Sequence, residues 1–376
     1  MEKSIYEEFL ERGFTRRDFL RFCALMAGTL ALPWDAVAKV EKALKSSKRL
    51  PLLWLEFQSC TADTESFLRA SNPSASQLIL DVLAVNYSET LMAAAGHQAE
   101  EVLWKTVEEE KGKYVAVVEG SIPTAEGGVY CTIGGETAVE RTKKVCKDAA
   151  AVICVGTCAC FGGIPMAKPN PTGAKSVEQV FPGVKNLLNL PACPVNVVNV
   201  SAALVHLLTF DILPAKDRLH RPLFAYGKRI HDACERRGSY DAGQFVEKWG
   251  DEGHRKGWCL YKMGCKGPAT FHNCPRVRWN DGTSWPIGSG HPCIGCSEPN
   301  FWDSMSPFYK HLPKIPGFGV ETTADKVGVG LVTATAAIFL LHGAGSWVRE
   351  QIIRRREEKD KEKKDRKGSR RPRNKD

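Results

Sequence analysis

Thiol and carboxylate groups follow the ends of apolar segments in the first half of this chain. Cys60 and Asp63 come directly after the apolar segment 50–57, and Cys158 and Cys193 each follow a later apolar segment. Thiolate sulfur binds zinc and iron-sulfur clusters, and a carboxylate is a harder ligand that suits iron. Three thiols would leave a four-coordinate site one ligand short, and Asp63 is the nearest group that could complete it.

Two alternatives compete with this interpretation of Asp63. Asp is a favoured helix N-cap, and the residues after Asp63 read T-E-S-F-L, so its carboxylate could cap a helix instead of binding iron. Cys160 could supply the fourth ligand, although it stands only two residues after Cys158, an awkward spacing for two ligands of one cluster. On spacing alone, the ligand and the cap are equally supported.

Alternating apolar and helical segments predict how these groups come together. Such alternation forms a parallel sheet covered on both faces, and ligands gather beyond the carboxyl ends of its strands. Cys60, Cys158 and Cys193 each lie within a few residues of such an end. The predicted strands span 50–57, 113–120, 150–156 and 184–191, and the predicted helices span 88–110 and 135–149.

The second half of the chain, from about residue 211, is irregular and rich in Gly, Pro, Trp and charge. A segment of this kind lacks a conventional core, so inorganic clusters would supply the cross-links that packing does not. Two ligand sets are indicated by their spacing. For the set that contains a histidine, zinc is the alternative to an iron-sulfur cluster. The sets are His231, Cys234, Cys259 and Cys265, and Cys274, Cys293 and Cys296.

The other cysteines and histidines have structural interpretations. Cysteines that fall before or inside regular elements are expected to be buried as small apolar residues. Lone histidines are expected in the core or on the surface. The cysteines are Cys131, Cys146 and Cys154, and the histidines are His97, His254 and His272.

Thirteen of the fourteen cysteines lie between residues 39 and 318. Exported proteins usually use cysteines for disulfides. Here the number is odd, the cysteines cluster at ligand spacings, and several stand beside His, Gly and Pro. Metal binding is therefore favoured over a disulfide framework.

The charge of the chain is concentrated in its C-terminal tail. With 43% hydrophobic residues the chain can bury a sizeable core, and its net charge is +9. The segment from Arg349 to Asp376 alone has 14 Lys and Arg against 7 Asp and Glu. The nearly neutral body argues against a nucleic-acid groove.

The N-terminal segment is typical of a twin-arginine export signal. Arg16 and Arg17 precede a moderately apolar run, and Ala36 and Ala38 have the spacing of a cleavage site. We therefore predict a signal peptide over 1–38. The alternative is an exposed basic start of a helix. Twin-arginine export carries folded proteins, so clusters built in the cytoplasm could cross intact.

The segment 327–347 has the properties of a membrane anchor. It contains no Asp, Glu, Lys or Arg, and at about 1.5 Å per residue it can cross a hydrocarbon core of roughly 30 Å. The basic tail 348–376 fits the cytoplasmic side, so the body would lie outside the cell membrane on a single span. A buried core helix is the alternative.

Several motifs together resemble the small subunit of membrane-bound uptake NiFe hydrogenases. The likeness runs from the export signal to the C-terminal anchor and is specific only in combination. It is carried by TRRDFL, ESFLRA, LMAAAGHQAEEV, VEGSIPT, GTCACFGG, AKPNPTGA, RIHDACERR, YDAGQF, RKGWCLYKMGCKGP and GHPCIGCSEPNFWD.

The resemblance implies three iron-sulfur clusters and a fold. The fold would be a flavodoxin-like parallel sheet domain over 39–210, followed by an irregular iron-sulfur domain over 211–318 and a C-terminal transmembrane helix. The medial cluster would have Pro286 where a fourth thiol could stand. The implied ligands are Cys60, position 63, Cys158 and Cys193 for a proximal cluster of the 4Fe-4S type, His231, Cys234, Cys259 and Cys265 for a distal 4Fe-4S cluster, and Cys274, Cys293 and Cys296 for a medial 3Fe-4S cluster.

This chain departs from the family pattern at the proximal cluster. The family usually has cysteine at position 63, where this chain has Asp63. It also has Ala62 and Gly163 where oxygen-tolerant membrane enzymes carry two extra cysteines. An aspartate-ligated proximal cluster resembles an oxygen-insensitive, high-affinity branch of the family, which favours Asp63 as a ligand.

The resemblance also implies partners. Hydrogen splitting would belong to a large subunit that holds nickel and iron, and this chain would conduct electrons without catalytic residues of its own. His342 resembles a ligand of haem b shared with a cytochrome b partner, which would pass electrons to quinone, and the alternative is an interfacial histidine without a metal. The Tat translocase would export the chain. Two other functions remain: the iron-sulfur subunit of another exported respiratory oxidoreductase, and a zinc-stabilised membrane scaffold.

Overall fold

The computed structural model describes residues 4–33, 35–46, 49–70, 74–75, 79, 82–280, 282–312 and 324–368. These residues fall into two compact units. The first comprises most of the chain up to Leu312, and the second contains the C-terminal helix.

A five-stranded parallel sheet organises the first unit. The strands lie in the order β2-β1-β3-β7-β9, which is the flavodoxin-like order 2-1-3-4-5. The predicted fold class is therefore confirmed, and four of the strands match the prediction closely. The fifth, β2, was not predicted. The strands are β1 Leu50–Glu56, β2 Leu83–Ser88, β3 Val115–Glu119, β7 Ala151–Val155 and β9 Leu187–Leu190.

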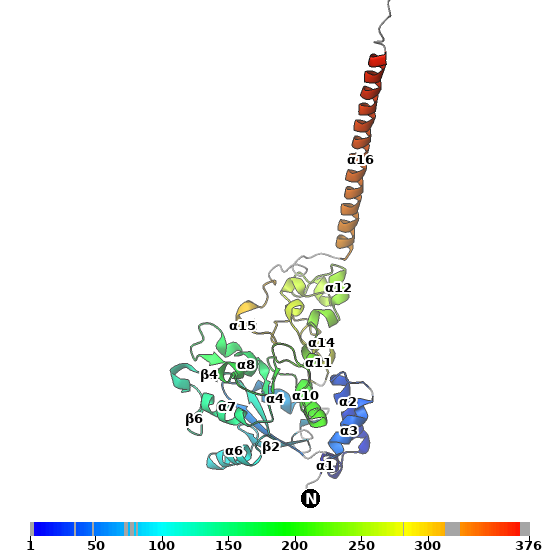
Figure 1. Cartoon of the computed structure of the whole chain (residues 1–376). Coiled ribbons are helices and arrows are strands. Elements are labelled where there is room, and N and C mark those ends of the chain that lie inside the picture. The colour runs from blue at the N-terminus through cyan, green and yellow to red at the C-terminus, as the bar shows by residue number, and fades with distance from the viewer. Residues whose placement is uncertain are drawn as a thin grey trace, which may run out of the picture. The chain divides into compact units, whose positions relative to one another are not determined.

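Both faces of the sheet are buried because successive side chains of a strand point to opposite faces. Leu52 and Trp54 of β1 belong to one apolar cluster, and Leu53 and Leu55 belong to the other. Figure 1 shows α6 and α7 on one side of the sheet and α2, α3 and α10 on the other. The covering helices are α6 His97–Glu109, α7 Ala138–Lys147, α8 Gly156–Phe161 and α9 Val177–Val180 on one face, and α10 Val197–Phe210 with three N-terminal helices on the other.

The two predicted helices exist but are shorter than expected. The segment 88–110 yields α6 only from His97, because β2 extends to Ser88 and turns follow it. The segment 135–149 yields α7, which begins at a capping box of Thr137 and Glu140. Short strands and turns connect these elements: β4 Ile122–Pro123, β5 Thr132–Ile133, β6 Glu136–Thr137, β8 Ala174–Lys175, and the 3-10 helices η2 Ala125–Gly128 and η3 Ile164–Met166.

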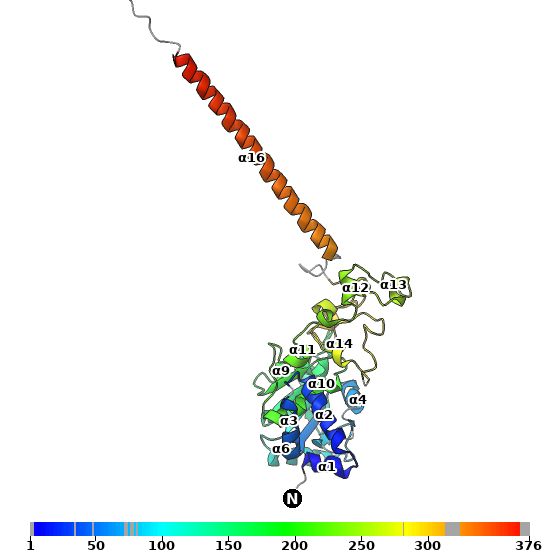
Figure 2. The same ribbon diagram turned by 90° about the vertical axis from the view of Figure 1, so that its right-hand side faces the viewer.

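The N-terminal segment forms three helices that pack on the body. They are α1 Ile5–Glu11, α2 Arg16–Thr29 and α3 Ala36–Ser46, and both ribbon views place them beside α10 (Figures 1 and 2). Phe19, Phe22 and Met26 of α2 are buried in the same apolar cluster as Leu52 and Trp54 of β1. Arg16 and Arg17 stay exposed at the start of α2. The signal peptide itself remains a prediction.

The chain beyond α10 is irregular, as its composition indicated. Arg229, Phe245 and Trp279 take part in isolated β-bridges, which join loops instead of strands. Between α10 and Leu312 the described helices are about one turn long: α11 Leu223–Tyr226, η4 Ile230–Ala233, α12 Arg237–Asp241, α13 Glu252–Arg255, η5 Tyr261–Met263, η6 Gly267–Ala269, α14 Cys274–Val277 and α15 Phe301–Ser304.

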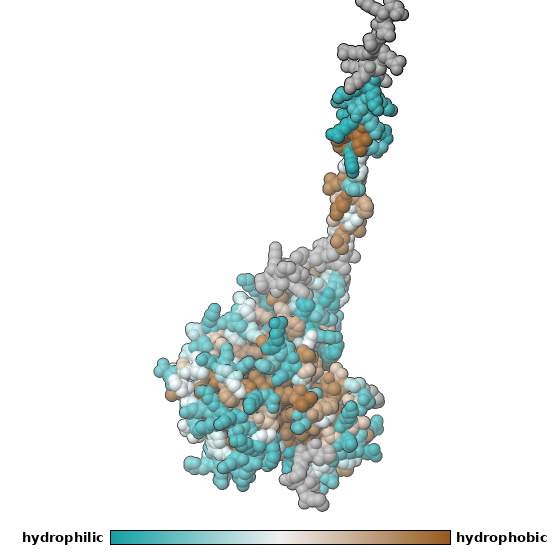
Figure 3. All heavy atoms as spheres, in the orientation of Figure 1, coloured by the Kyte–Doolittle hydropathy of each residue, from teal (hydrophilic) through white to brown (hydrophobic). Residues whose placement is uncertain are grey.

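The C-terminal helix α16 runs over Ala324–Gly368, 45 residues. From Gly328 onward the helix is long and apolar enough to cross a membrane, so it is a candidate membrane span. The membrane anchor remains a prediction, as does the alternative of a core helix. Figure 3 shows an apolar band along α16 followed by a hydrophilic stretch, and Figure 2 shows the helix as one continuous rod. The helix continues past Trp347 through the charged tail to Gly368.

Candidate functional site

The four predicted proximal ligands lie together at the carboxyl edge of the sheet. Cys60 follows β1, Cys158 lies in α8 directly after β7, and Cys193 follows β9. Burial raises the pKa of Cys158 to about 12, and the nearby Cys193, Asp63 and Cys60 raise it further. Burial likewise raises the pKa of Cys193 to about 12, with Asp63 and Cys60 again contributing. If these groups were ionised without a metal, their negative charges would repel one another. The positive charge of a bound metal centre would offset this repulsion.

Asp63 is buried inside this group. It lies in the first turn of α4 Ala62–Leu68 with 7% of its surface exposed. Its Oδ1 accepts a 2.5 Å hydrogen bond from the amide of Val195. Burial raises its pKa to about 8, and the charge of Glu119 adds to this rise.

The N-cap alternative for Asp63 is wrong, because another residue performs that role. The N-cap position of α4 is Thr61, and the first-turn amides of Asp63 and Thr64 donate to the carboxylate of Glu119 at 3.2 and 3.0 Å. Glu119 ends β3, is fully buried, and also accepts hydrogen bonds from Ser59 and the Thr64 hydroxyl. The carboxylate of Asp63 therefore does not cap α4, and it lies close enough to Cys158 and Cys193 to raise the pKa of both thiols.

Two glycines make room for the proximal group. Gly156 has φ +76°, and a Cβ there would stand 2.0 Å from Oδ2 of Asp63. Gly163 has φ +63°, and a Cβ there would stand 2.3 Å from Sγ of Cys158. Because both positions favour glycine by conformation and by space, a side chain at either would displace a predicted ligand.

Cys160 belongs to the core instead of the site. Its Sγ donates to the carbonyl of Cys154 at 3.4 Å, and its side chain packs in the apolar cluster on the α8 face of the sheet. Cys146 and Cys154 are buried in the same cluster, and Cys131 packs against it. The prediction that these cysteines act as small apolar residues agrees with their positions.

The four predicted distal ligands line one cavity. The same cavity is bordered by Arg236 and Arg237, and the amide of Arg236 donates to Sγ of Cys234 at 3.4 Å. Burial raises the pKa of Cys234 to about 11 and that of Cys259 to about 12. The lining ligands are His231, Cys234, Cys259 and Cys265.

The three predicted medial ligands line a second cavity of about 590 Å³, together with Pro286. Burial raises the pKa of each thiol, and the neighbouring thiols of the set add to this rise for Cys274 and Cys293. His272 is a core residue next to this cavity. Its Nδ1 accepts the amide of Cys274 at 3.0 Å, and burial lowers its pKa to about 3, so the ring is neutral. The ligands are Cys274, Cys293 and Cys296.

The three sets lie next to one another. Cys193 of the proximal set lines the same cavity as Cys274, Cys293 and Cys296 of the medial set. The amide of Cys293 in the medial set donates to Sγ of Cys265 in the distal set at 3.4 Å. The sets thus form a series, proximal to medial to distal.

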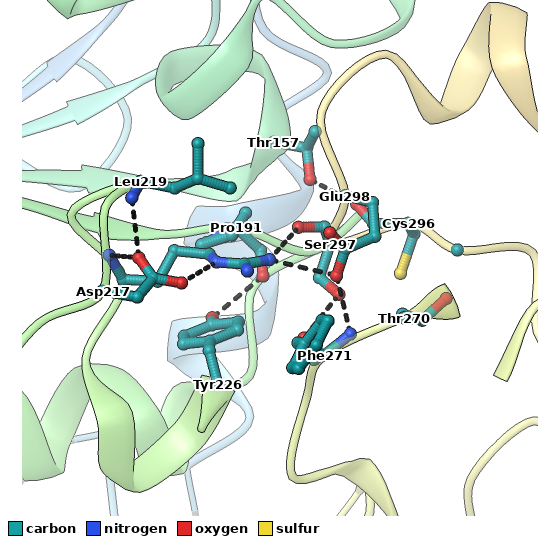
Figure 4. Close-up of polar contacts among 12 residues, drawn as sticks. Thr157, Pro191, Asp217, Leu219, Tyr226, Thr270, Phe271, Cys296, Ser297 and Glu298 are labelled. Carbon is teal, nitrogen blue, oxygen red and sulfur yellow. Dashed lines mark hydrogen bonds and ion pairs between the residues drawn. The ribbon is translucent and has the colours of Figure 1, made fainter. Parts of the chain in front are cut away.

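A buried ion network holds the loop 296–298, here called the medial loop, near the carboxyl edge of the sheet (Figure 4). Arg221, 4% exposed, donates to Asp217 at 2.8 Å and to Glu298 at 3.0 Å. The same Glu298 oxygen accepts the amide of Phe271 at 2.6 Å. Thr157, next to Cys158, donates to the carbonyl of Cys296. The network therefore ties the loops that carry proximal and medial ligands to each other.

The donor sets suit a metal cluster with several atoms. Among the described residues, no three His, Cys, Asp or Glu side chains converge closely enough to hold one metal ion. Thiols on the walls of a cavity are the arrangement that an iron-sulfur cluster uses, because its own irons and sulfides fill the space between ligands. The residues present therefore fit such clusters.

Three charged residues of the site were missed in the sequence. Glu119 stands in the motif VEGSIPT at the end of a predicted strand, so its position beside Cys60 could have been inferred. Arg221 and Lys266 could not be placed at the site from the sequence, because Glu298 and Phe308, which they contact, lie 77 and 42 residues away.

Comparison with known proteins agrees with this arrangement. Residues 226–309 match the C-terminal family model of the NiFe/NiFeSe hydrogenase small subunit, and residues 60–207 match NADH ubiquinone oxidoreductase, 20 Kd subunit. The chain is 45% identical to the quinone-reactive Ni/Fe-hydrogenase small chain of Wolinella succinogenes, over 88% of this chain and 96% of that one. It is 44% identical to the uptake hydrogenase small subunit of Azotobacter vinelandii, over 91% and 95%.

Solved structures show the same likeness. A reduced, active Ni-Fe-Se hydrogenase from Desulfomicrobium baculatum matches with a TM-score of 0.66 and 35% identity, over 70% of this chain and 100% of that one. An actinobacterial-type NiFe-hydrogenase from Ralstonia eutropha matches with a TM-score of 0.67 and 27% identity, over 78% and 90%. Small subunits of this family pair with a large catalytic subunit. This chain belongs to the family of NiFe hydrogenase small subunits.

Proposed function

We propose that this chain conducts electrons from hydrogen oxidation in the large subunit through three iron-sulfur clusters to a membrane acceptor. The observation that carries the proposal is the adjacency of the three donor sets: Cys193 lines the cavity of the medial set, and the amide of Cys293 donates to Sγ of Cys265 in the distal set. When bound, such clusters take up and release single electrons.

The residues of this chain divide the work among three sites. The proximal set would hold a 4Fe-4S cluster with Asp63 as one ligand, and the distal set would hold a 4Fe-4S cluster with one histidine ligand. The medial set would hold a 3Fe-4S cluster, because it has three thiols and the fourth cysteine of the cavity, Cys193, is assigned to the proximal set. Pro286 lines the same cavity. Glu119 and Arg221 bind no iron in this scheme and instead fix the loops that carry the ligands.

The two ends of the chain support a location at the cell membrane. We propose that Arg16 and Arg17, exposed at the start of α2, are read by the Tat translocase, and that residues 1–38 are then removed. The body would lie on the periplasmic side and the charged end of α16 in the cytoplasm. His342 on α16 would bind haem b of a cytochrome b partner. The Wolinella relative, named quinone-reactive, supports quinone as the final acceptor.

Membership of the hydrogenase family disfavours the two other functions. Another exported respiratory oxidoreductase would not share 45% identity with a hydrogenase small chain over nearly its full length. A zinc scaffold would not need three adjacent donor sets.

The proposal is tested on the purified complex of both subunits. Cys259→Ser should remove electron transfer at the distal site while leaving hydrogen splitting intact, so deuterium exchange with water should survive and dye reduction should fall at least tenfold. Cys131→Ser, outside the three sets, is the matched control and should leave both activities unchanged. Equal loss of exchange and dye reduction in Cys259→Ser would contradict the proposed role.

A further inference from the structure

Lys266 is a buried lysine at the centre of the iron-sulfur segment. Only 2% of its surface is exposed, and its Nζ donates to the carbonyls of Gly264 at 2.7 Å and Phe308 at 3.1 Å, and to that of Lys310. The ammonium thus lies in a cage of backbone carbonyls.

The cage fixes the charge of Lys266. Three carbonyl oxygens require three N–H donors, and a lysine side chain offers three donors only as the protonated ammonium. All three acceptors are neutral, so they solvate the positive charge without cancelling it. A buried charge acts through a lower effective dielectric than a surface charge, so its influence on neighbouring groups is strong.

Lys266 lies between two of the donor sets. It directly follows Cys265 of the distal set, and its amide donates to the carbonyl of Cys293 in the medial set at 2.8 Å. The amide of Cys293 in turn donates to Sγ of Cys265. The lysine therefore lies at the junction between the distal and medial sets. The thiols of Cys265 and Cys293 both act electrostatically on its ammonium group.

We propose that Lys266 is a positioning residue that holds a fixed positive charge at this junction and raises the reduction potentials of both the medial and the distal centre. Each reduced centre carries one more negative charge than its oxidised form, so a nearby cation stabilises the reduced form. The proposal rests on the proposed function, since it needs clusters in both sets.

The test is a redox titration of the holo complex, followed by paramagnetic resonance. Lys266→Met and Lys266→Gln should change the ratio of reduced to oxidised medial and distal centres about tenfold at a fixed potential, a downward shift of about 59 mV for one electron. The proximal centre should keep its potential. Lys266→Arg should retain the wild-type potentials because it keeps the charge. Lys256→Met, at a lysine with 58% of its side chain exposed, is the matched control.

Each outcome decides the proposal. Unchanged medial and distal potentials in the neutral variants would overturn the proposal. Equal shifts in the Arg variant and the neutral variants would also overturn it, because the shift would then come from altered packing and not from loss of the charge. If the neutral variants lose iron, the Arg variant decides: wild-type potentials support the role of charge and shifted potentials refute it. Failure to find three centres in the wild-type complex would instead refute the proposed function.

Discussion

The carboxylate of Asp63 accepts a 2.5 Å hydrogen bond from the backbone amide of Val195, two residues beyond Cys193. This contact joins the start of α4, which follows Cys60, to the loop after β9. Because Glu119 accepts the first-turn amides of α4, Asp63 makes no contribution as a cap. Its buried carboxyl group therefore lies near three thiols and accepts a hydrogen bond from the loop that carries the predicted ligand Cys193.

We predict that Asp63→Asn removes or alters the proximal cluster without unfolding the chain. The Asn Oδ1 can still accept the amide of Val195, but a neutral amide is a far poorer iron ligand than a carboxylate. The proximal signal should lose intensity or shift in potential, as measured by paramagnetic resonance and redox titration. Asp63→Cys should restore a four-iron cluster with an altered response to oxygen. A wild-type spectrum and potential in Asp63→Asn would show that Asp63 does not bind iron.

A second prediction concerns His231, which is 6% exposed and packs edge-on against Tyr240 at 4.7 Å. His231→Ala should perturb the distal centre and lower dye reduction at least tenfold, while the large subunit keeps its deuterium exchange. His97→Ala, at an exposed histidine, is the control. Parallel loss of both activities in His231→Ala would indicate a structural role instead.

A third prediction concerns the ion network of Arg221. Arg221→Met leaves Asp217 and Glu298 without their shared cation, and removal of one partner from a buried ion pair costs about 3 kcal/mol or more. The complex should unfold at a lower temperature, and amide exchange should accelerate at 296–298. Lys105→Met removes a pair whose side chains are 63% exposed and should change neither measurement. An Arg221 variant with the wild-type unfolding temperature would refute this account of the medial loop.

Much of this architecture could be predicted because it depends on local patterns. The apolar segments of β1, β3, β7 and β9 are nearly continuous, since both faces of a parallel sheet are buried, and each ends near a cysteine. The edge strand β2 is less apolar, with Asn86 and Ser88 in its six residues, so its pattern resembled the start of the helix that follows.

The rest of the site depends on contacts between distant segments. The capping role considered for Asp63 is taken by Glu119, which lies 56 residues away in sequence. Glu298 and Phe308, which contact Arg221 and Lys266, likewise come from loops that only the fold brings near them. The predicted distal and medial sets contain closely spaced cysteines, and the predicted proximal cysteines each follow an apolar segment, so these patterns are visible in the sequence. The charged residues around them follow no such pattern.

A fourth prediction concerns the orientation of α16 in the membrane. The charged end of the helix should stay in the cytoplasm, because basic residues flank the inner side of membrane spans. Protease added to intact spheroplasts should spare a tag attached after Asp376 and should digest the body. Digestion of the tag with an intact body would reverse the topology.

The central claim is that this chain carries three iron-sulfur clusters, and the most direct test is iron and acid-labile sulfide analysis of the purified complex combined with a redox titration. Two four-iron clusters and one three-iron cluster correspond to about 11 irons and about 12 sulfides in this chain, after the nickel-iron centre of the large subunit is subtracted. The account predicts these contents and three separately titrating centres. Fewer than three centres, or zinc in place of iron at the distal set, would contradict it.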